Sequence, residues 1–124
     1  MDILRGLASV PDSFAETGTV VTIGVFDGVH RGHQLLISKA VETARGAGAP
    51  CVVMTFDPHP VTIFAPNRAP RALMPLEERA RHIADLGVDA LLVIDLRREI
   101  GGLTPTQYMN EVLVDTLHAR HVLV

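Results

Sequence analysis

The chain has 124 residues, of which 48% are hydrophobic and 20% charged, and 11 basic against 14 acidic side chains give a net charge of -3. This length allows one domain at most. The slightly acidic balance gives no electrostatic reason to expect nucleic acid or an anionic membrane as the main partner.

The cysteine content and the hydropathy pattern bear on where the protein works. Cys51 is the only cysteine, so no intrachain disulfide can form and a reducing compartment is expected. It opens an apolar run, where a thiol more often packs than reacts. The start shows no signal peptide, and no apolar run is long enough to cross a bilayer. The sequence therefore predicts a cytoplasmic protein without a membrane partner.

The first half of the chain alternates between strand-like and helix-like patterns. Residues 1–18 are rich in turn formers and predict a loose lead-in. The β-branched run 20–25 predicts a short strand buried on both faces, and a glycine-punctuated loop follows over residues 27–32. Apolar residues at helical spacing between Leu35 and Ala44 predict a helix, and Gly46 and Gly48 are expected to end it.

A second apolar run, over residues 51–56, predicts another buried strand. It ends at Asp57-Pro58-His59-Pro60, because two prolines so close together cannot continue a central strand. Residues 61–74 predict a long surface loop. Pro75 then begins a helix that ends at Gly87, and residues 90–94 predict a third strand.

The clearest helix start is Thr104-Pro105-Thr106-Gln107, a capping box with proline at the first helical position. The helix is expected to continue to Leu117, and residues 121–124 begin a fourth strand. Strands that alternate with helices predict a Rossmann-like α/β fold, an open parallel sheet with helices on both faces. A central strand with no helix after it predicts a domain incomplete at its C-terminus, whose exposed sheet edge would permit self-association.

The candidate chemistry lies between the first strand and the first helix. In an open α/β sheet, ligands bind outside the carboxyl ends of the strands, and unpaired N–H groups at a helix start form a phosphate site. Gly32 would let the backbone approach an oxyanion closely, and both His30 and His33 would project toward the same phosphate. The pattern is neither a Walker A loop nor a GxGxxG fingerprint. His-x-Gly-His directly after a strand resembles the signature of the HxGH nucleotidyltransferases.

Simpler explanations stay open for the residues of this loop. The two histidines could be idle in solvent, or they could bind a metal, although no cysteine or carboxylate cluster completes a ligand set and no metal-ligating residue is predicted. Asp27 could only stabilise an Asp-Gly turn. Gly24 and Gly28 could be purely conformational.

A second candidate segment follows the second strand and is expected beside the first loop. Asp57 could orient a substrate hydroxyl or phosphate through a metal-bound water, with His59 as an added donor. Alternatively, Asp57 only caps the turn before Pro58 and His59 is idle. The remaining histidines fall in helix or strand contexts and are expected to pack or to face solvent; they are His82, His118 and His121.

Two longer strings resemble one family. Residues 22–33 read Thr-Ile-Gly-Val-Phe-Asp-Gly-Val-His-Arg-Gly-His and resemble the first signature of the bacterial bifunctional riboflavin kinase/FMN adenylyltransferase (FAD synthetase) family. Residues 54–60 read Met-Thr-Phe-Asp-Pro-His-Pro and resemble its next signature. Residues 5–7 and 103–105 also fit, so the resemblance spans nearly the whole chain.

This resemblance implies adenylyl transfer from ATP to FMN, giving FAD and pyrophosphate, with magnesium and without a covalent intermediate. His30 and His33 would contact the ATP phosphates and stabilise charge that develops at the α-phosphorus. Asp57 would complete the catalytic set, toward the flavin phosphate and the metal. The nucleotide and flavin pocket would be formed by Gly24, Val25, Phe26, Asp27, Gly28, Gly32, Phe56, Pro58 and His59.

The chain departs from the family pattern in two respects. Val25 stands where many relatives have asparagine. The family also continues beyond the position of Val124 with further nucleotide- and flavin-binding motifs and a riboflavin kinase module. Residues 1–124 are therefore expected to be the N-terminal part of the adenylyltransferase domain, with little turnover in isolation. Two alternatives remain: a nucleotidyltransferase with another phosphorylated acceptor, and a catalytically inactive nucleotide-binding fragment.

Overall fold

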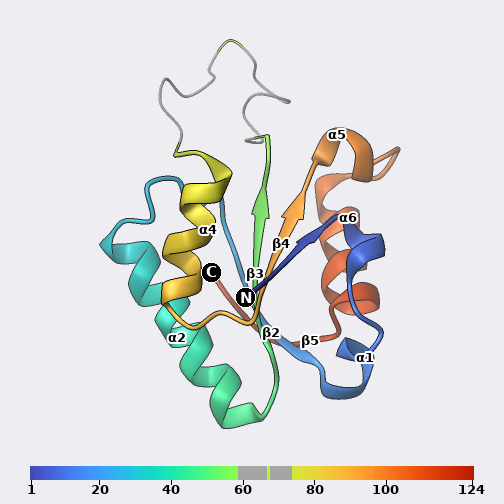
Figure 1. The fold of residues 1–124 in the computed structure, drawn as a ribbon. Helices are drawn as coiled ribbons and strands as arrows, with labels where there is room; N and C mark the ends of the chain where they lie inside the picture. The colour runs from blue at the N-terminus through green and yellow to red at the C-terminus, as the bar shows by residue number, and fades with distance from the viewer. Residues whose placement is uncertain (59–66, 68–73) are drawn as a thin grey trace.

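The structure, a computed structural model, describes residues 1–58, 67 and 74–124. Its strands form one parallel sheet in the order β1-β4-β3-β2-β5 (Figure 1). Their bounds are β1 (Asp2–Arg5), β2 (Thr19–Ile23), β3 (Cys51–Phe56), β4 (Ala90–Ile94) and β5 (Ala119–Leu123). Helices cover both faces of the sheet. The predicted Rossmann-like α/β fold is confirmed.

Each face of the sheet buries its own core, because successive side chains along a strand point to opposite faces. The helices α2 (Arg31–Ala47) and α4 (Leu76–Asp85) pack on the face that carries Val20, Val53 and Leu91. The other face carries Val21, Val52 and Leu92 and packs against α1 (Phe14–Thr17), α5 (Leu96–Glu99), α6 (Pro105–Asn110) and the π-helical segment η3 (Glu111–Thr116). Burial on both faces explains why the central strands read as continuous apolar runs.

The strand order reverses at β2. From β2 the chain builds the sheet in one direction through β3 and β4, and it then returns to place β5 on the other side of β2. Such a reversal opens a crevice at the carboxyl ends of the two strands, which is where open α/β sheets bind ligands. Residues 24–30 leave β2 at this point, so the fold puts the first candidate loop at the switch.

The helix α2 begins and ends on identifiable signals. His30 is its N-cap in an extended conformation, and α2 starts at Arg31. Gly48 ends the helix in the left-handed conformation, with φ of 64°, and its N–H donates to the carbonyls of Ala44 and Arg45. Gly46, expected to contribute to the stop, lies inside the helix instead, since Gly48 alone supplies the cap.

The lead-in predicted for residues 1–18 is wrong, because this segment forms β1, the 3-10 turn η1 (Leu7–Ser9) and α1. The strand β1 pairs with β4 alone, at the edge of the sheet. Only Leu4 along it is half-buried. A strand of four residues with one inward side chain shows no alternation of apolar and polar residues from which it could be predicted. Its regularity comes from the backbone ladder with β4 rather than from its own sequence.

Two further differences lie near the end of the chain. The last strand, expected to be central, pairs with β2 alone and is an edge strand of the described sheet. The capping box at Thr104 and Gln107 is confirmed, with bonds of 3.2 Å and 2.9 Å between them. The helix, expected to stay regular to Leu117, is α-helical only to Asn110 and continues as η3.

None of the helices in the described part of the chain has the length and apolar character of a membrane span.

Candidate functional site

The loop after β2 has a strained backbone that is held by burial. Phe26 has a φ of 56° and Val29 a φ of 41°, values that residues with a side chain rarely adopt. Both side chains are almost fully buried, and the N–H of Val29 donates to the carbonyl of Phe26 at 3.1 Å. The fold therefore forces this loop into one shape, as is common where a site must be preorganised.

Two glycines make that shape possible. A Cβ on Gly24 would lie 2.9 Å from the ring of Phe26, which is too close without movement of the ring. Gly28 has a φ of 81°, in the left-handed region that favours glycine. The conformational explanation for both residues thus has a concrete basis in this loop.

The structure brings His30 and His33 together at the start of α2. Their rings stack with centroids 3.7 Å apart and an interplanar angle of 22°. The ring of Phe26 meets His33 edge-on, with centroids 5.2 Å apart. Gly32 lies between the histidines in the exposed first turn, and a Cβ there would make only ordinary contact, at 3.6 Å, with the ring of His30. The pair is therefore presented at a helix N-terminus, as the motif predicts.

His33 has an unusual environment. Its pKa is lowered from the ordinary 6.5, chiefly because burial disfavours the charged imidazolium and then because His30 lies beside it, while the carboxylate of Asp27 raises it in part. Its Nδ1 is buried and has no hydrogen-bond partner among the described residues. A buried, unpaired ring nitrogen calls for a partner, and an incoming ligand group would supply one.

The carboxylate of Asp27 is already engaged across the fold. It accepts a hydrogen bond of 2.6 Å from the N–H of Met74, just before α4. This contact joins the loop after β2 to the segment that leads into α4, so Asp27 does more than stabilise its own Asp-Gly turn.

The second candidate segment is only partly gathered at the loop. Asp57 directly follows β3, and its side chain is 47% exposed and lies 3.9 Å from Arg79 Nη2. Phe56 is half-buried and packs with the core on the face of α5 and α6, whereas Phe26 belongs to the core on the face of α2 and α4. The structure thus does not bring Phe56 to the histidine loop. His59 lies outside the described residues.

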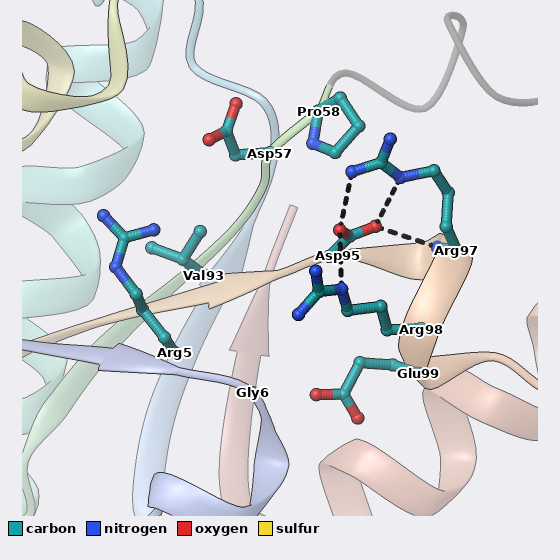
Figure 2. Close-up of a pocket in the computed structure, with 9 residues that line it drawn as sticks. All are labelled: Arg5, Gly6, Asp57, Pro58, Val93, Asp95, Arg97, Arg98 and Glu99. Atoms are coloured by element: carbon teal, nitrogen blue, oxygen red, sulfur yellow. Dashed lines mark hydrogen bonds and ion pairs between the residues drawn. The ribbon is translucent and has the colours of Figure 1, made fainter.

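A cavity of about 470 Å³ opens beside Asp57, at the carboxyl ends of β1, β3 and β4. Figure 2 shows Asp57 and Arg5 on one side and Arg97, Arg98 and Glu99 on the other. The complete lining is Arg5, Gly6, Asp57, Pro58, Val93, Asp95, Arg97, Arg98 and Glu99. Charged side chains of both signs dominate it.

Within this cavity the carboxylate of Asp95 is tightly held. Arg97 donates to it from Nη2 at 2.8 Å and from Nε at 3.0 Å, and Arg98 Nε lies 3.8 Å away. The hydrogen bonds from Arg97 lower the pKa of Asp95, against a smaller opposing effect of burial. These residues were missed from the sequence, although Asp95-Leu96-Arg97-Arg98 directly follows a predicted strand, the position at which ligand contacts are expected.

A resident metal centre is not preformed here. Among the described residues no three histidine, cysteine or acidic side chains gather as metal ligands. Magnesium in nucleotide enzymes commonly takes one or two carboxylates and completes its shell with phosphates and water. The exposed carboxylate of Asp57 is a ligand of the kind that this pattern uses.

The residues expected to be inert are placed as predicted. Cys51 is fully buried, and burial together with Asp89 raises the pKa of its thiol to about 11, so it is not a nucleophile at neutral pH. The three histidines outside the two segments are exposed; they are His82, His118 and His121.

Comparison with known proteins gives consistent matches. A family model described as FAD synthetase matches residues 13–124. The bifunctional riboflavin kinase/FMN adenylyltransferase of Escherichia coli K12 is 37% identical over the whole chain, and that of Bacillus subtilis is 34% identical over 85% of it. The chain spans 39% and 33% of the lengths of these two relatives.

Two solved structures are similar to the fold. A crystal structure described as a macrolide-efflux protein from Streptococcus pneumoniae superposes with a TM-score of 0.76 and 26% identity, covering 99% of this chain and 47% of the other. Pantothenate synthetase from Thermus thermophilus superposes with a TM-score of 0.52 and 20% identity, covering 95% and 44%. The second likeness concerns the fold alone.

Proposed function

This chain belongs to the FAD synthetase family, and from that premise we propose that it takes part in adenylyl transfer from ATP to FMN, which yields FAD and pyrophosphate. The phosphate of FMN attacks the α-phosphorus of ATP, and pyrophosphate leaves. The chain would serve this reaction by positioning the two substrates and by stabilising charge, since phosphoryl-group transfer needs little covalent chemistry from the protein.

The observation that carries this proposal is the stacked pair of His30 and His33 at the start of α2. No side chain of the described residues caps the first turn of this helix, so its N–H groups are available to phosphate oxygens. The positive end of the helix dipole adds to their attraction. In this proposal the two imidazoles and these N–H groups would bind the same phosphate, beside the point between β2 and β5 where the strand order reverses.

The lowered pKa of His33 fits a role as a neutral hydrogen-bond donor. With its pKa lowered, the imidazole is neutral near neutral pH and keeps one ring N–H, which can donate to a phosphate oxygen. Donors that are preorganised toward the developing charge are typically the largest contribution to this kind of catalysis.

The cavity beside Asp57 is the proposed place of FMN. Its volume of about 470 Å³ lies in the range of small-molecule pockets, and its arginines offer donors to an anionic ligand. Asp57 lies at its border, where the flavin phosphate would approach the α-phosphorus and where a magnesium ion bound to ATP would meet a carboxylate. A cytoplasmic location and self-association through β5 stay predictions from the sequence.

Acceptor choice is the test that separates this function from its alternatives. The protein is incubated with Mg-ATP and, in separate reactions, with FMN, nicotinamide mononucleotide or phosphopantetheine, and adenylylated products are separated by chromatography. FAD as the main product supports the proposal. A main product from another acceptor assigns a different nucleotidyltransferase. Saturable Mg-ATP binding without any product identifies a nucleotide-binding protein that does not catalyse the transfer.

A further inference from the structure

Arg79 is a cation buried beneath the candidate site. It lies on α4 and is only 5% exposed. Burial of a guanidinium is costly unless its donors are used, because the group keeps its charge and loses its water. An apolar side chain of similar size would fill the same space between α4 and the sheet without that cost. The groups that accept hydrogen bonds from Arg79 therefore indicate why a cation lies at this position.

Arg79 holds the carbonyl of Val25, just beyond the end of β2. Nη1 donates to this oxygen at 2.8 Å and lies 3.3 Å from the hydroxyl of Thr55, which itself donates to the same carbonyl at 2.9 Å. Three groups from three segments thus form a closed triangle. The carbonyl of Val25 receives two hydrogen bonds, both from buried side chains.

These contacts begin where the backbone ladder stops. The last residue pair between β2 and β3 is Ile23 with Met54, followed only by a bond from Gly24 N–H to the Met54 carbonyl. Past that point the described residues form no further backbone hydrogen bond between the two segments, which lead to the histidine loop and to Asp57. Side chains rather than the sheet must then fix the distance between them.

The same guanidinium also reaches the second segment. Nη2 of Arg79 lies 3.9 Å from Oδ1 of Asp57. In the part of the chain that the structure describes, Nε of Arg79 has no hydrogen-bond partner. The guanidinium therefore keeps one N–H that no described residue accepts, so its hydrogen bonds are not all used within the protein. One planar guanidinium connects the loop after β2 with the carboxylate after β3.

We propose that Arg79 is a positioning residue for the adenylyl transfer: by holding the Val25 carbonyl and facing Asp57, it keeps the His30–His33 pair in register with the acceptor side of the site. The inference rests on the proposed function for its catalytic consequence. Its structural part stands by itself, since the loop conformation at Phe26 depends on where the preceding carbonyl is fixed.

The test uses three variants and one matched control. Arg79→Met keeps the length of the side chain but removes every donor, Arg79→Lys restores one donor, and Thr55→Val removes only the hydroxyl of the triangle. Arg81→Met is the control, because Arg81 lies two residues further along α4 and is exposed. Circular dichroism and thermal unfolding first establish the temperature at which each variant is folded, and all later measurements are made below it.

Hydrogen–deuterium exchange measures the positioning directly. In Arg79→Met, peptides that cover residues 24–34 are expected to exchange at least tenfold faster than in the parent, with α6 unchanged. Thr55→Val is expected to show a smaller increase, and Arg81→Met none. Unchanged exchange of residues 24–34 in folded Arg79→Met overturns the proposal, whether or not the protein makes FAD. If Arg79→Met does not fold, the same comparison in Arg79→Lys and Thr55→Val decides it.

Steady-state FAD formation measures the catalytic consequence. Arg79→Met is expected to lower kcat by tenfold or more with a smaller change in KM for FMN, since misplaced histidines act on the transition state. Arg79→Lys is expected to recover part of kcat. Wild-type kcat in Arg79→Met that has lost its loop protection overturns the catalytic part. Because residues 1–124 alone are expected to show little turnover, kcat is measured in a chain that also carries the further motifs of the family. If that chain forms no FAD, the proposed function is contradicted, and the exchange result still decides the positioning role.

Discussion

The ring of Phe26 stands edge-on against His33, at 5.2 Å between centroids and 88° between planes, while the rest of Phe26 is buried in the core on the face of α2 and α4. One side chain thus belongs both to the core and to the candidate site. The orientation of a histidine expected to touch the nucleotide is thereby coupled to the packing of the domain.

Substitution of Phe26 should affect binding as well as stability. Phe26→Leu retains an apolar side chain and should cost about 1–1.5 kcal/mol of stability, and it should also weaken Mg-ATP binding by several-fold, because His33 loses its ring contact. Denaturant unfolding and calorimetric titration measure the two effects. Phe14→Leu is the control, since Phe14 is buried on the opposite face and should lose stability alone. Equal effects of the two substitutions on Mg-ATP affinity would refute the coupling.

The titration of His33 should respond to its two charged neighbours in opposite directions. His30→Ala removes a like charge and should raise the lowered pKa of His33, and Asp27→Asn removes a favourable charge and should lower it further. NMR of the histidine ring signals measures both shifts. The titration covers roughly pH 4–8, which includes the range in which histidine changes its charge. The assignment of causes is wrong if either substitution moves the pKa in the other direction.

The same lowered pKa predicts a pH dependence of stability. The folded state disfavours the protonated His33, so the free energy of unfolding should be undiminished by this group above pH 6.5 and should fall as the pH decreases through the lowered value. Substitution of His33 by leucine should flatten this part of the curve. An unchanged slope in His33→Leu between pH 6.5 and the measured pKa of His33 would contradict the prediction.

Asp89 should contribute to stability through a different pair of contacts. Its carboxylate accepts from Cys51 N–H at 2.7 Å and from Arg45 Nη1 at 2.9 Å. Burial by itself raises the pKa of Asp89, but these hydrogen bonds outweigh it and the net direction is downward. Asp89→Asn should cost about 1 kcal/mol at pH 7, a value discounted for partial exposure.

The cost of Asp89→Asn should depend on acidity in a defined way. Because the folded pKa is depressed, the stabilisation should be complete above the ordinary value of 3.8 and should fade as the pH falls through the folded value. Asp85→Asn at the exposed end of α4 serves as control and should be close to neutral. A cost of Asp89→Asn that persists unchanged in acid would exclude the carboxylate as its source.

Gly24 offers a test of the loop conformation itself. Gly24→Ala places a Cβ 2.9 Å from the ring of Phe26, so the ring must move and Mg-ATP binding should weaken by about tenfold or more, equivalent to about 1.4 kcal/mol. Gly46→Ala is the matched control: nothing lies within 4 Å of its Cβ, and it should stabilise α2 by up to about 1 kcal/mol. Full Mg-ATP affinity in Gly24→Ala would show that the loop tolerates another shape.

The sequence was most informative where burial is uniform. β3 and β4 were predicted at their observed bounds, because strands buried on both faces are continuous apolar runs. The capping box at Thr104 was found because its chemistry is local. β1 was missed for the opposite reason: an edge strand takes its regularity from its partner, β4, and Leu4 alone along it faces a core.

The residues of the candidate site could likewise be predicted only where the signal is local in the sequence. His30 and His33 could be proposed from the sequence because their motif lies within four residues and follows a strand. Arg79 was not, since its partners Val25 and Thr55 lie 54 and 24 residues away and only the fold unites them. The charged lining of the cavity beside Asp57 was equally invisible, because it draws on the ends of β1, β3 and β4 together.

The central claim is that the His30–His33 pair forms the nucleotide site, and calorimetric titration of the chain and of His30→Ala with Mg-ATP and, separately, with FMN tests it most directly. The account predicts saturable Mg-ATP binding that His30→Ala weakens by at least tenfold, with FMN affinity nearly unchanged. Mg-ATP binding of equal strength in folded His30→Ala would contradict it, because the nucleotide would then be held elsewhere.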